Sequence, residues 1–382
     1  MEAIEIAKIF EKKFGKNYRI FQAPGRINLI GEHTDYNLGY VMPGAINKYI
    51  HLAIKENHLN TFRIYAANLD QMVEFSFHDQ PTSLPGWARY PAGVIRELHK
   101  LEYSINGFDA VFGGNIPSGA GLSSSAALES VFGVAINALD KLQLTQREIA
   151  KVGQMAEHNS VGVKCGIMDQ FASIFGQENQ LIRLDCRNLS FELVPFKNTG
   201  FSLLLADTQV KHSLASSAYN ERREQCEEGV KVISQIYPQV VSLRDVTHEM
   251  ISEVNSRLDP IVKKRCEYVV EENSRLLKTS EALGVGNIKL VGELLYGSHY
   301  GLKDKYEVSC TELDFLVDIA QSTSGVLGAR MMGGGFGGCT INLIEKGAVD
   351  TFKAKAEESF FNRFGKAPLF YEVSISNGAR EI

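Results

Sequence analysis

Hydrophobic residues recur along the chain at spacings that are typical of helices in some segments and of strands in others. The first segment has apolar residues at helical spacing up to Phe14, and Gly15 is a plausible stop signal. Further helices are predicted over 91–102, 126–142, 145–161, 214–237 and 260–282. Short apolar runs predict strands over 18–23, 27–30, 49–55, 61–66, 108–113, 181–185, 191–195, 201–206, 338–344 and 369–375.

The order of these elements follows neither a regular strand–helix–strand repeat nor a single type, so the predicted fold class is α+β. With 382 residues the chain exceeds the size at which one hydrophobic core usually stops growing, and two domains are therefore expected. The polar stretch GQENQ at 176–180 separates a mostly helical region from a new set of strands. The predicted domains are 1–177 and 178–382.

Composition and charge exclude several classes of protein. Apolar residues make up 44% of the chain and charged residues 22%, as in soluble globular proteins. The net charge of −5 argues against nucleic acid as a partner. The N-terminus is charged throughout, no apolar run approaches the roughly 18 residues of a membrane span, and the six cysteines show no CxxC spacing. We expect a cytoplasmic protein without membrane association, zinc site or redox pair.

The segment GRINLIGEHTDYNLGYVMP, residues 25–43, combines polar and charged residues with apolar positions and chain-breaking glycines. This mixture predicts a strand that runs into a tight turn and gathers Arg26, Glu32, His33 and Asp35 around one small volume. Carboxylates accept hydrogen bonds from neighbouring hydroxyl groups, and an imidazole can donate or accept. The segment therefore predicts a pocket for a polyhydroxylated ligand.

A second segment, GGNIPSGAGLSSSAALE at 113–129, places glycines and three serines directly before a strongly apolar helix. Backbone N–H groups at a helix N-terminus favour anions, and glycine lets the backbone approach a ligand closely. The segment lacks the GK[ST] ending of a Walker A loop and does not match a dinucleotide-binding fingerprint. We interpret it as a phosphate-binding loop of another type.

Two further segments carry candidate chemistry. In CGIMDQF, residues 165–171, the carboxylate of Asp169 stands among apolar neighbours, where a charge is usually paired or functional, and Arg26 is its expected partner. In GVLGARMMGGGFGGC, residues 325–339, five glycines occupy six positions, which would be costly inside a helix or strand. Such a run suits a backbone that lies against another surface.

Taken in order, the segments 25–43, 113–129 and 325–339 resemble the three motifs of the galactokinases, within the GHMP family of small-molecule kinases. The resemblance covers essentially the whole chain. It implies two α+β domains with the active site in the cleft between them. It also implies ATP-dependent phosphorylation of the C1 hydroxyl of α-D-galactose, with ATP and Mg²⁺ as cofactors and D-galactose and ATP as small-molecule partners.

The resemblance also assigns roles to residues. Asp169 would take the proton from the C1 hydroxyl or orient it, and Arg26 would steady Asp169 and the transferring phosphoryl group. The implied sugar-binding residues are Glu32, His33, Asp35, Gly166, Asp169 and Tyr219. The implied ATP-binding residues are Gly119, Gly121, Leu122, Ser123, Ser124, Ser125, Ala126 and Trp87. Mg²⁺ would be held by Ser125 and Glu157.

Several alternatives stay open. Trp87 could equally belong to ordinary core packing, and Glu157 taken alone could be a solvated carboxylate on a helix face. Lys211 is a basic residue expected near the phosphate, whereas His299 is taken as structural. N-acetylgalactosamine, galacturonate and arabinose are alternative substrates, and a non-catalytic sensor of galactose and ATP is an alternative function. A monomer is expected.

Overall fold

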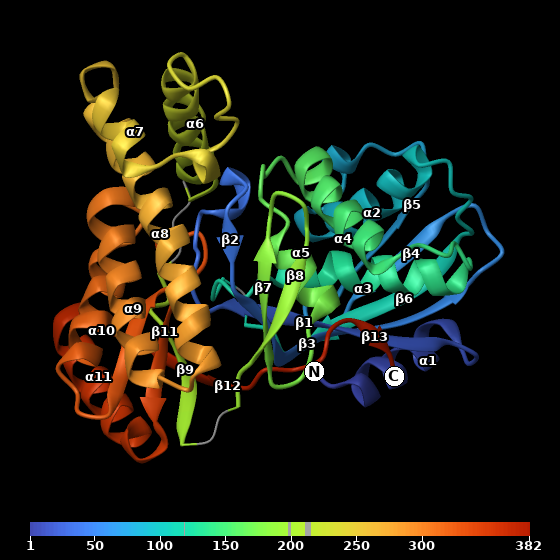
Figure 1. The fold of residues 1–382 in the computed structure, drawn as a ribbon. Helices are drawn as coiled ribbons and strands as arrows, with labels where there is room; N and C mark the ends of the chain where they lie inside the picture. The colour runs from blue at the N-terminus through green and yellow to red at the C-terminus, as the bar shows by residue number, and fades with distance from the viewer. Residues whose placement is uncertain (118, 198–199, 211–214) are drawn as a thin grey trace.

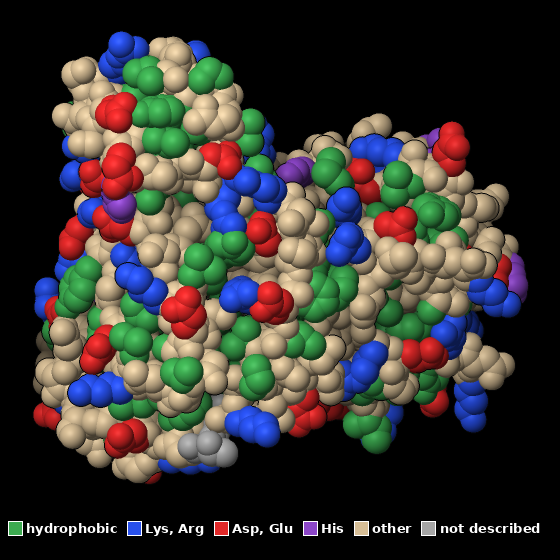
Figure 2. Space-filling view, viewed as in Figure 1, with side chains coloured by type: hydrophobic (Ala, Val, Ile, Leu, Met, Phe, Trp, Pro, Cys, Tyr) green, Lys and Arg blue, Asp and Glu red, His purple; other side chains and the backbone are tan. Residues whose placement is uncertain are grey.

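The computed structural model describes residues 1–117, 119–197, 200–210 and 215–382. Its elements form two lobes that lie side by side, with α1 to α5 in one lobe and α6 to α11 in the other (Figure 1). The space-filling view shows a notch at the top between these lobes (Figure 2). Among the described residues, no helix is long and apolar enough to cross a membrane.

The first lobe is built on a six-stranded sheet in the order β13-β1-β3-β6-β4-β5, where only β4 and β6 run parallel. Its strands are β1 (Arg19–Asn28), β3 (Pro43–Glu56), β4 (Phe62–Ala66), β5 (Gln71–Phe75), β6 (Phe108–Gly114) and β13 (Arg380–Glu381). The helices are α1 (Ala3–Phe14), α2 (Arg89–Lys100), α3 (Ser124–Leu139), α4 (Gln146–Ala156) and α5 (Met168–Phe175).

Alternating side chains along the strands bury both faces of this sheet. In β3, Leu52 and Ile54 join the large core formed with α2, α3, α4 and α5, whereas Ala53 packs with Ile6 and Phe10 of α1 on the other face. The sheet is thus a central layer, with four helices on one side and α1 on the other (Figure 1).

The second lobe contains an antiparallel sheet in the order β10-β11-β9-β12. Its strands are β9 (Phe201–Asp207), β10 (Val326–Met331), β11 (Cys339–Glu345) and β12 (Leu369–Val373). The helices are α6 (Ala215–Ser234), α7 (His248–Glu253), α8 (Pro260–Gly284), α9 (Ile288–Tyr300), α10 (Thr311–Gln321) and α11 (Val349–Phe364). Leu203 and Leu205 of β9 pack with α8 and α9, while Leu204 and Ala206 pack with α10 and α11.

Two connections cross the boundary predicted at residue 177. A three-stranded sheet pairs β2 (Tyr40–Val41) with β7 (Gln180–Asp185), which in turn pairs with β8 (Phe191–Pro195). In addition, β13 pairs with β1, so residues 380–381 extend the sheet of the first lobe. The first connection places β7 against the end of the signature segment, residues 25–43, and the second places β13 against Phe21 and Gln22, just before this segment.

The predicted helices and strands are all present, with four corrections. The strands predicted over 18–23 and 27–30 are one strand, β1, which passes through Pro24 and Gly25 with a shift in register against β3. The predicted helix 145–161 is α helix only to Ala156 and continues as a π-helical turn, Glu157–Val161. The strand at 49–55 begins earlier, at Pro43, and the last predicted strand ends at Val373.

The structure also contains elements that were not predicted, among them β10, α5, α9, α10 and α11. Glycines obscure the pattern in α9 and β10 for a physical reason. A Cβ on Gly292 of α9 would lie 2.0 Å from the carbonyl oxygen of Leu327 in β10, so only glycine allows this close helix–strand contact. Gly292 weakens the helical pattern in the sequence, but the packing of α9 against β10 requires it.

Candidate active site

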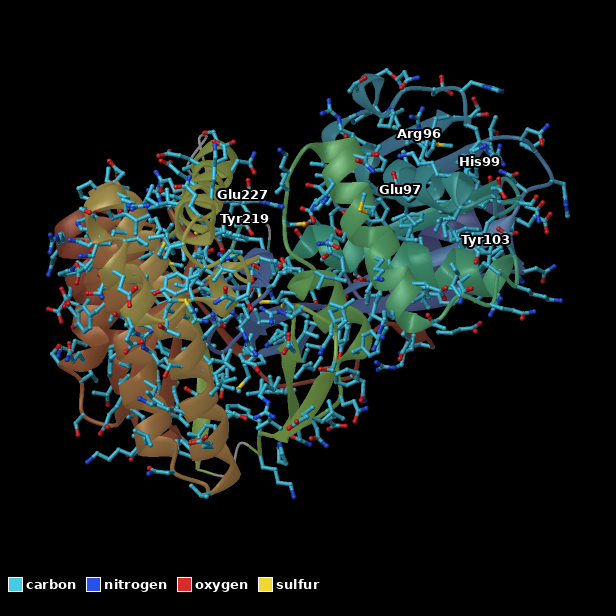
Figure 3. The ribbon with its side chains drawn as sticks, turned by 45° about the horizontal axis from the view of Figure 1, so that its top comes forward. Arg96, Glu97, His99, Tyr103, Tyr219 and Glu227 are labelled. Carbon is cyan, nitrogen blue, oxygen red and sulfur yellow. The ribbon has the colours of Figure 1, made fainter. Side chains whose placement is uncertain are left out.

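A cavity of about 150 Å³ lies between the two lobes. Its lining is Arg26, Glu32, His33, Asp35, Glu157, Val163, Cys165, Gly166, Met168, Asp169, Tyr219, Gly333 and Gly334. All residues that were predicted to bind sugar are in this lining. Tyr219 reaches it from α6 of the second lobe and lies on the side of that helix that faces the first lobe (Figure 3).

Arg26 and Asp169 form a bidentate ion pair at the cavity wall, as predicted. Arg26 Nε donates to Asp169 Oδ1 over 2.8 Å, and its second terminal nitrogen donates to Oδ2 over 3.0 Å. Burial alone would lower the pKa of Arg26, but the carboxylates of Asp169, Glu32 and Asp35 outweigh it and raise the pKa. Arg26 is therefore a fixed positive charge beside the carboxylate that was predicted to act in catalysis.

The glycine-rich loop before α3 is held by the same arginine. The Arg26 guanidinium donates to the carbonyl oxygen of Gly121 over 2.6 Å, and its backbone N–H donates to that of Leu122 over 3.1 Å. Ser123 precedes α3 with φ of 55° and donates its hydroxyl to Asp169 instead of capping the helix. The first N–H groups of α3 have no side-chain cap, which is the arrangement that favours an anion.

The third glycine-rich segment packs against this loop. A Cβ added to Gly333 would lie 3.5 Å from the carbonyl oxygen of Gly121, and one added to Gly338 would lie 3.6 Å from Ala120. The two glycine-rich segments, more than 200 positions apart in the sequence, therefore meet beside the cavity. This contact agrees with the prediction that the glycine run within 325–339 lies against another surface, which here is the backbone of the loop before α3.

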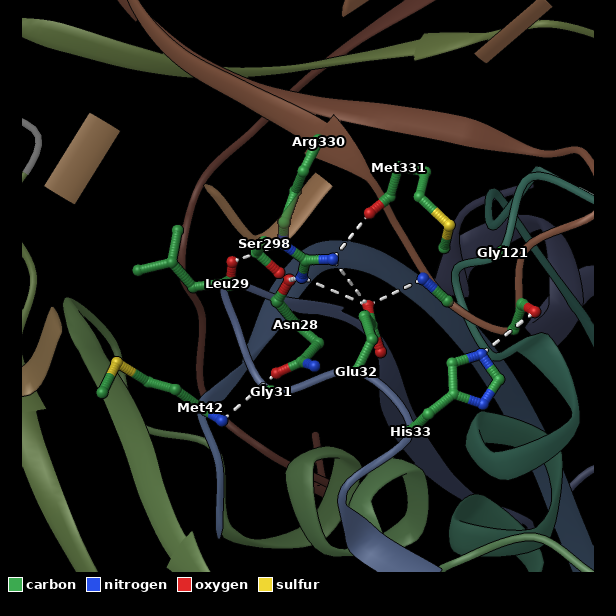
Figure 4. A network of polar contacts seen from close by, with 12 residues as sticks. Asn28, Leu29, Gly31, Glu32, His33, Met42, Gly121, Ser298, Arg330 and Met331 are labelled. Carbon is green, nitrogen blue, oxygen red and sulfur yellow. Dashed lines mark hydrogen bonds and ion pairs between the residues drawn. The ribbon is translucent and has the colours of Figure 1, made fainter. Parts of the chain in front are cut away.

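Glu32 is bound by a network that the sequence analysis missed (Figure 4). Its Oε1 accepts from the N–H of Gly333 over 2.7 Å and from both terminal nitrogens of Arg330 over 3.2 Å. Arg330 is fully buried and also donates to the backbone carbonyl groups of Asn28, Leu29 and Met331. It thereby ties β10 of the second lobe to the signature segment of the first.

His33 sits in the cavity with an unusual backbone conformation, φ of 60°. Its ring lies 5.2 Å from the ring of Tyr219 and 4.9 Å from that of Tyr306. Burial lowers the pKa of His33 to about 3, helped by the charges of Arg222 and Arg330. The imidazole is therefore neutral at physiological pH.

Gly166 makes room for the side chain of Asp35. A Cβ at this position would lie 1.9 Å from Asp35 Oδ2, so no other residue fits without moving the carboxylate. We expect Gly166→Ala to raise the KM for the sugar that the sequence resemblance implies by about tenfold or more, because overpacking of this kind costs ~1–3 kcal/mol. Steady-state kinetics test this, with Gly284→Ala as a control, since nothing lies within 4 Å of a Cβ there. An unchanged KM in Gly166→Ala would contradict the expectation.

The carboxyl group of Asp35 lowers the stability of the folded protein at neutral pH when no sugar is bound. Burial, together with the nearby charges of Asp169 and Glu32, raises the pKa of this carboxyl to about 7. Between about pH 4 and 7 the folded protein thus holds a proton that the unfolded chain has lost, so this carboxyl makes the folded protein less stable as the pH rises. The loss is limited to ~1.4 kcal/mol per pH unit.

We therefore expect Asp35→Asn to gain stability relative to the parent by about 2 kcal/mol between pH 5 and pH 6.5. The free energy of unfolding in urea, measured without sugar at both pH values, tests this. The comparison with the parent cancels the titration of the carboxyl groups that do not interact with Asp35. A difference between parent and variant that is the same at both pH values would contradict the assignment.

Glu157 lies at the start of the π-helical turn and shares a hydrogen-bond donor with a second buried carboxyl group. Gln170 Nε2 donates to Glu157 Oε2 over 3.0 Å and to Glu129 Oε2 over 2.8 Å, and Cys165 Sγ contacts Glu157 Oε2 over 3.4 Å. Burial and the nearby Asp169 raise the pKa of Glu157 to about 7. Glu157 is thus buried beside the site, unlike the solvated carboxylate that the helical pattern alone suggested.

Other predicted residues lie outside the cavity lining. Ser124, Ser125 and Ala126 begin α3, behind the glycine-rich loop. Trp87 lies in a short 3₁₀ helix, donates Nε1–H to Gln71 over 2.8 Å and packs 5.5 Å from Phe112. His299 is fully buried and accepts from the N–H of Met331, in agreement with its structural interpretation. Lys211 falls outside the described residues.

The fold and the cavity together are those of the GHMP kinases. Models of the GHMP kinase N-terminal and C-terminal domains match residues 89–177 and 279–362. The model of the galactokinase galactose-binding signature matches residues 8–56, which contain the signature segment. The chain is 43% identical to a galactokinase of Thermosipho africanus, over 94% of this chain and 99% of the relative. This chain belongs to the galactokinase family.

Further comparisons agree with this assignment. A galactokinase of Clostridium beijerinckii is 41% identical and is covered, like this chain, over its full length. The crystal structure of Lactococcus lactis galactokinase complexed with galactose superposes with a TM-score of 0.94 at 35% identity and covers 99% of both chains. A Methanococcus jannaschii mevalonate kinase has a TM-score of 0.65 at 19% identity, a likeness of fold alone.

Proposed function

We propose that this protein transfers the γ-phosphoryl group of ATP to the C1 hydroxyl of α-D-galactose, which gives α-D-galactose 1-phosphate and ADP. The observation that carries the proposal is the Arg26–Asp169 ion pair, which joins a sugar-sized cavity to the glycine-rich loop at the N-terminus of α3. Membership of the galactokinase family supports the same substrates. The reaction is the entry step of galactose breakdown.

In this mechanism Asp169 orients the C1 hydroxyl and accepts its proton, which leaves the oxygen free to attack the phosphoryl group. Phosphoryl transfer requires little covalent chemistry from the protein, so positioning and electrostatic stabilisation dominate. Arg26 pairs with Asp169 and also donates to the carbonyl oxygen of Gly121 in the proposed phosphate-binding loop. General-base assistance typically contributes about 10²–10⁴-fold.

The phosphates of ATP are proposed to lie on the loop residues Gly119, Gly121, Leu122, Ser123, Ser124, Ser125 and Ala126. The uncapped N-terminus of α3 supports this placement because its N–H groups are available to an anion. The bound nucleotide is proposed to extend towards Trp87.

Ser125 and Glu157 supply oxygen donors that fit Mg²⁺, which prefers one or two carboxylates together with phosphate oxygens and water. The described residues contain no group of three or more His, Cys, Asp or Glu side chains suited to a metal, so most other ligands would come from ATP and water. When bound, Mg²⁺ would neutralise charge on the phosphates. Gln170 orients Glu157 from the buried side.

The sugar is proposed to bind Glu32, His33, Asp35, Gly166, Asp169 and Tyr219. Because the carboxylates of Glu32 and Asp169 and the neutral imidazole of His33 are already held by protein groups, the pocket is preorganised for hydroxyl groups. We further infer that 1–177 and 178–382 act as two domains with the site between them, and that the protein works as a monomer in the cytoplasm.

The test is Mg²⁺-dependent ADP release, coupled to a reporter, with D-galactose, N-acetylgalactosamine, galacturonate and arabinose at equal concentration. We expect release with galactose well above that with the other sugars. Preference for another sugar would overturn the substrate assignment but keep the kinase. Galactose binding without ADP release would favour a sensor instead.

Trp87, the single tryptophan, provides an optical test of where the nucleotide lies. We expect ATP to change its fluorescence because the indole packs against Phe112 of β6. Phe112 directly precedes the glycine-rich segment that begins at Gly113. Galactose alone serves as the control and should change the signal less. No response to ATP would place Trp87 in ordinary core packing, away from the nucleotide.

A further inference from the structure

A chain of hydrogen bonds leads from the cavity into the second lobe. His33 Nδ1 lies 2.7 Å from the hydroxyl of Tyr36, which lies 2.8 Å from the hydroxyl of Tyr306. The Tyr306 hydroxyl in turn lies 3.1 Å from Cys226 Sγ. Neither Tyr36 nor Tyr306 lines the cavity, and neither has a role in the phosphoryl transfer proposed for Asp169 and Arg26.

The second ring nitrogen of His33, Nε2, determines which group donates and which accepts in each of these hydrogen bonds. His33 Nε2 lies 3.2 Å from the carbonyl oxygen of Gly334, which can only accept. Nε2 therefore carries the hydrogen, and Nδ1 of the neutral ring must accept from Tyr36. The Tyr36 oxygen is then free to accept from Tyr306, and the Tyr306 oxygen accepts from the thiol of Cys226.

Tyr306 is placed in this chain by a rare backbone conformation. It ends a π-helical turn, Gly301–Tyr306, and such turns occur frequently at functional sites. Two buried arginines bind the end of the turn: Arg222 Nε donates to the carbonyl oxygen of Tyr306 over 2.8 Å, and Arg265 donates to that of Lys305. The turn is thus fixed, and the Tyr306 side chain is fully buried.

We propose that Tyr306, acting through Tyr36, is a positioning residue for the sugar pocket that holds His33 as the Nε2–H tautomer. In this form Nε2–H, which donates to the carbonyl oxygen of Gly334, is the only donor of the ring, and Tyr36 occupies Nδ1, so the imidazole is held in one orientation at the cavity. Burial, which keeps the imidazole neutral, supports this assignment. The effect on galactose binding rests on the proposed function, whereas the tautomer itself does not.

The first experiment measures the ring nitrogens of His33 by ¹⁵N NMR in the sugar-free protein labelled at histidine. We expect a protonated Nε2 and an unprotonated Nδ1 in the parent, and a shift of the Nδ1 resonance in Tyr36→Phe and Tyr306→Phe. Tyr296→Phe is the matched control because the hydroxyl of this tyrosine has no hydrogen-bond partner among the described residues. An Nδ1–H tautomer in the parent would overturn the proposal, whether or not galactose is the substrate.

The second experiment measures the dissociation constant of galactose by calorimetry in a double-mutant cycle. We expect Tyr306→Phe to weaken binding about 3- to 10-fold, the range for one hydrogen bond, and to have less than a twofold effect in a His33→Ala background. Tyr296→Phe should leave binding unchanged in both backgrounds. Equal weakening in both backgrounds, or none in either, would show that Tyr306 does not act through His33.

Discussion

Asp169→Asn is expected to lower kcat by about 10²–10⁴-fold while galactose still binds. The amide keeps the shape of the carboxylate but can no longer accept the proton of the C1 hydroxyl. It also breaks the bidentate pair with Arg26, whose guanidinium then lacks its charge partner beside the glycine-rich loop. Single-turnover kinetics and calorimetric titration with galactose separate these two effects.

The first lobe offers a matched control for this substitution. Arg63 and Asp109 form a bidentate pair of the same kind, with distances of 2.7 and 2.8 Å, away from the lining of the active-site cavity. Asp109→Asn should lower stability without a comparable loss of kcat in the folded enzyme. Near-normal turnover in Asp169→Asn would remove this residue from the catalytic role.

Arg330→Met is expected to have the largest effect on stability, a loss of about 3–5 kcal/mol in the free energy of unfolding. The substitution leaves the buried carboxylate of Glu32 without its ion-pair partner and leaves two backbone carbonyl groups of the signature segment, those of Asn28 and Leu29, without this donor. Methionine fills a similar volume, so the loss reports the missing charge and hydrogen bonds. Urea unfolding monitored by circular dichroism gives the measurement.

Arg19→Met provides the comparison. Arg19 also forms a bidentate ion pair, with Glu381, but the two side chains are 38% and 47% exposed. Exposed pairs of this kind contribute ~0–1 kcal/mol, so the variant should remain close to the parent. If Arg330→Met unfolded at the same urea concentration as Arg19→Met, the network around Glu32 would not be a determinant of stability.

The site residues that could be predicted share a local signal. Asp169 stands out as a lone charge among apolar neighbours, and Glu32, His33 and Asp35 lie within four positions of one another. Arg330 carries the same kind of signal in VLGARMM, but its partner Glu32 is 298 positions away and the glycine run next to it dominates the pattern. Its role depends on how β10 meets the signature segment.

Helices and strands were predicted correctly where the hydrophobic residues kept one spacing, helical or alternating, along the segment. The predictions failed where packing or backbone geometry departed from that regular spacing. The pattern over 145–161 continues smoothly, yet the backbone widens into a π-helical turn at Glu157. The turn that ends at Tyr306 is equally invisible to a helical repeat, because it is held by Arg222 and Arg265 from other helices. Both turns bring a buried polar side chain to the site or to the residues that support it.

The pairing of β13 with β1 has a consequence for biosynthesis. Glu381 lies opposite Phe21, and β1 carries Arg26 further along the same strand. During translation, the edge of β1 stays open until residue 381 has emerged from the ribosome, although the rest of that sheet is made long before. An unpaired strand edge attracts other chains, so a nascent or prematurely terminated chain is exposed to aggregation at the strand that carries Arg26.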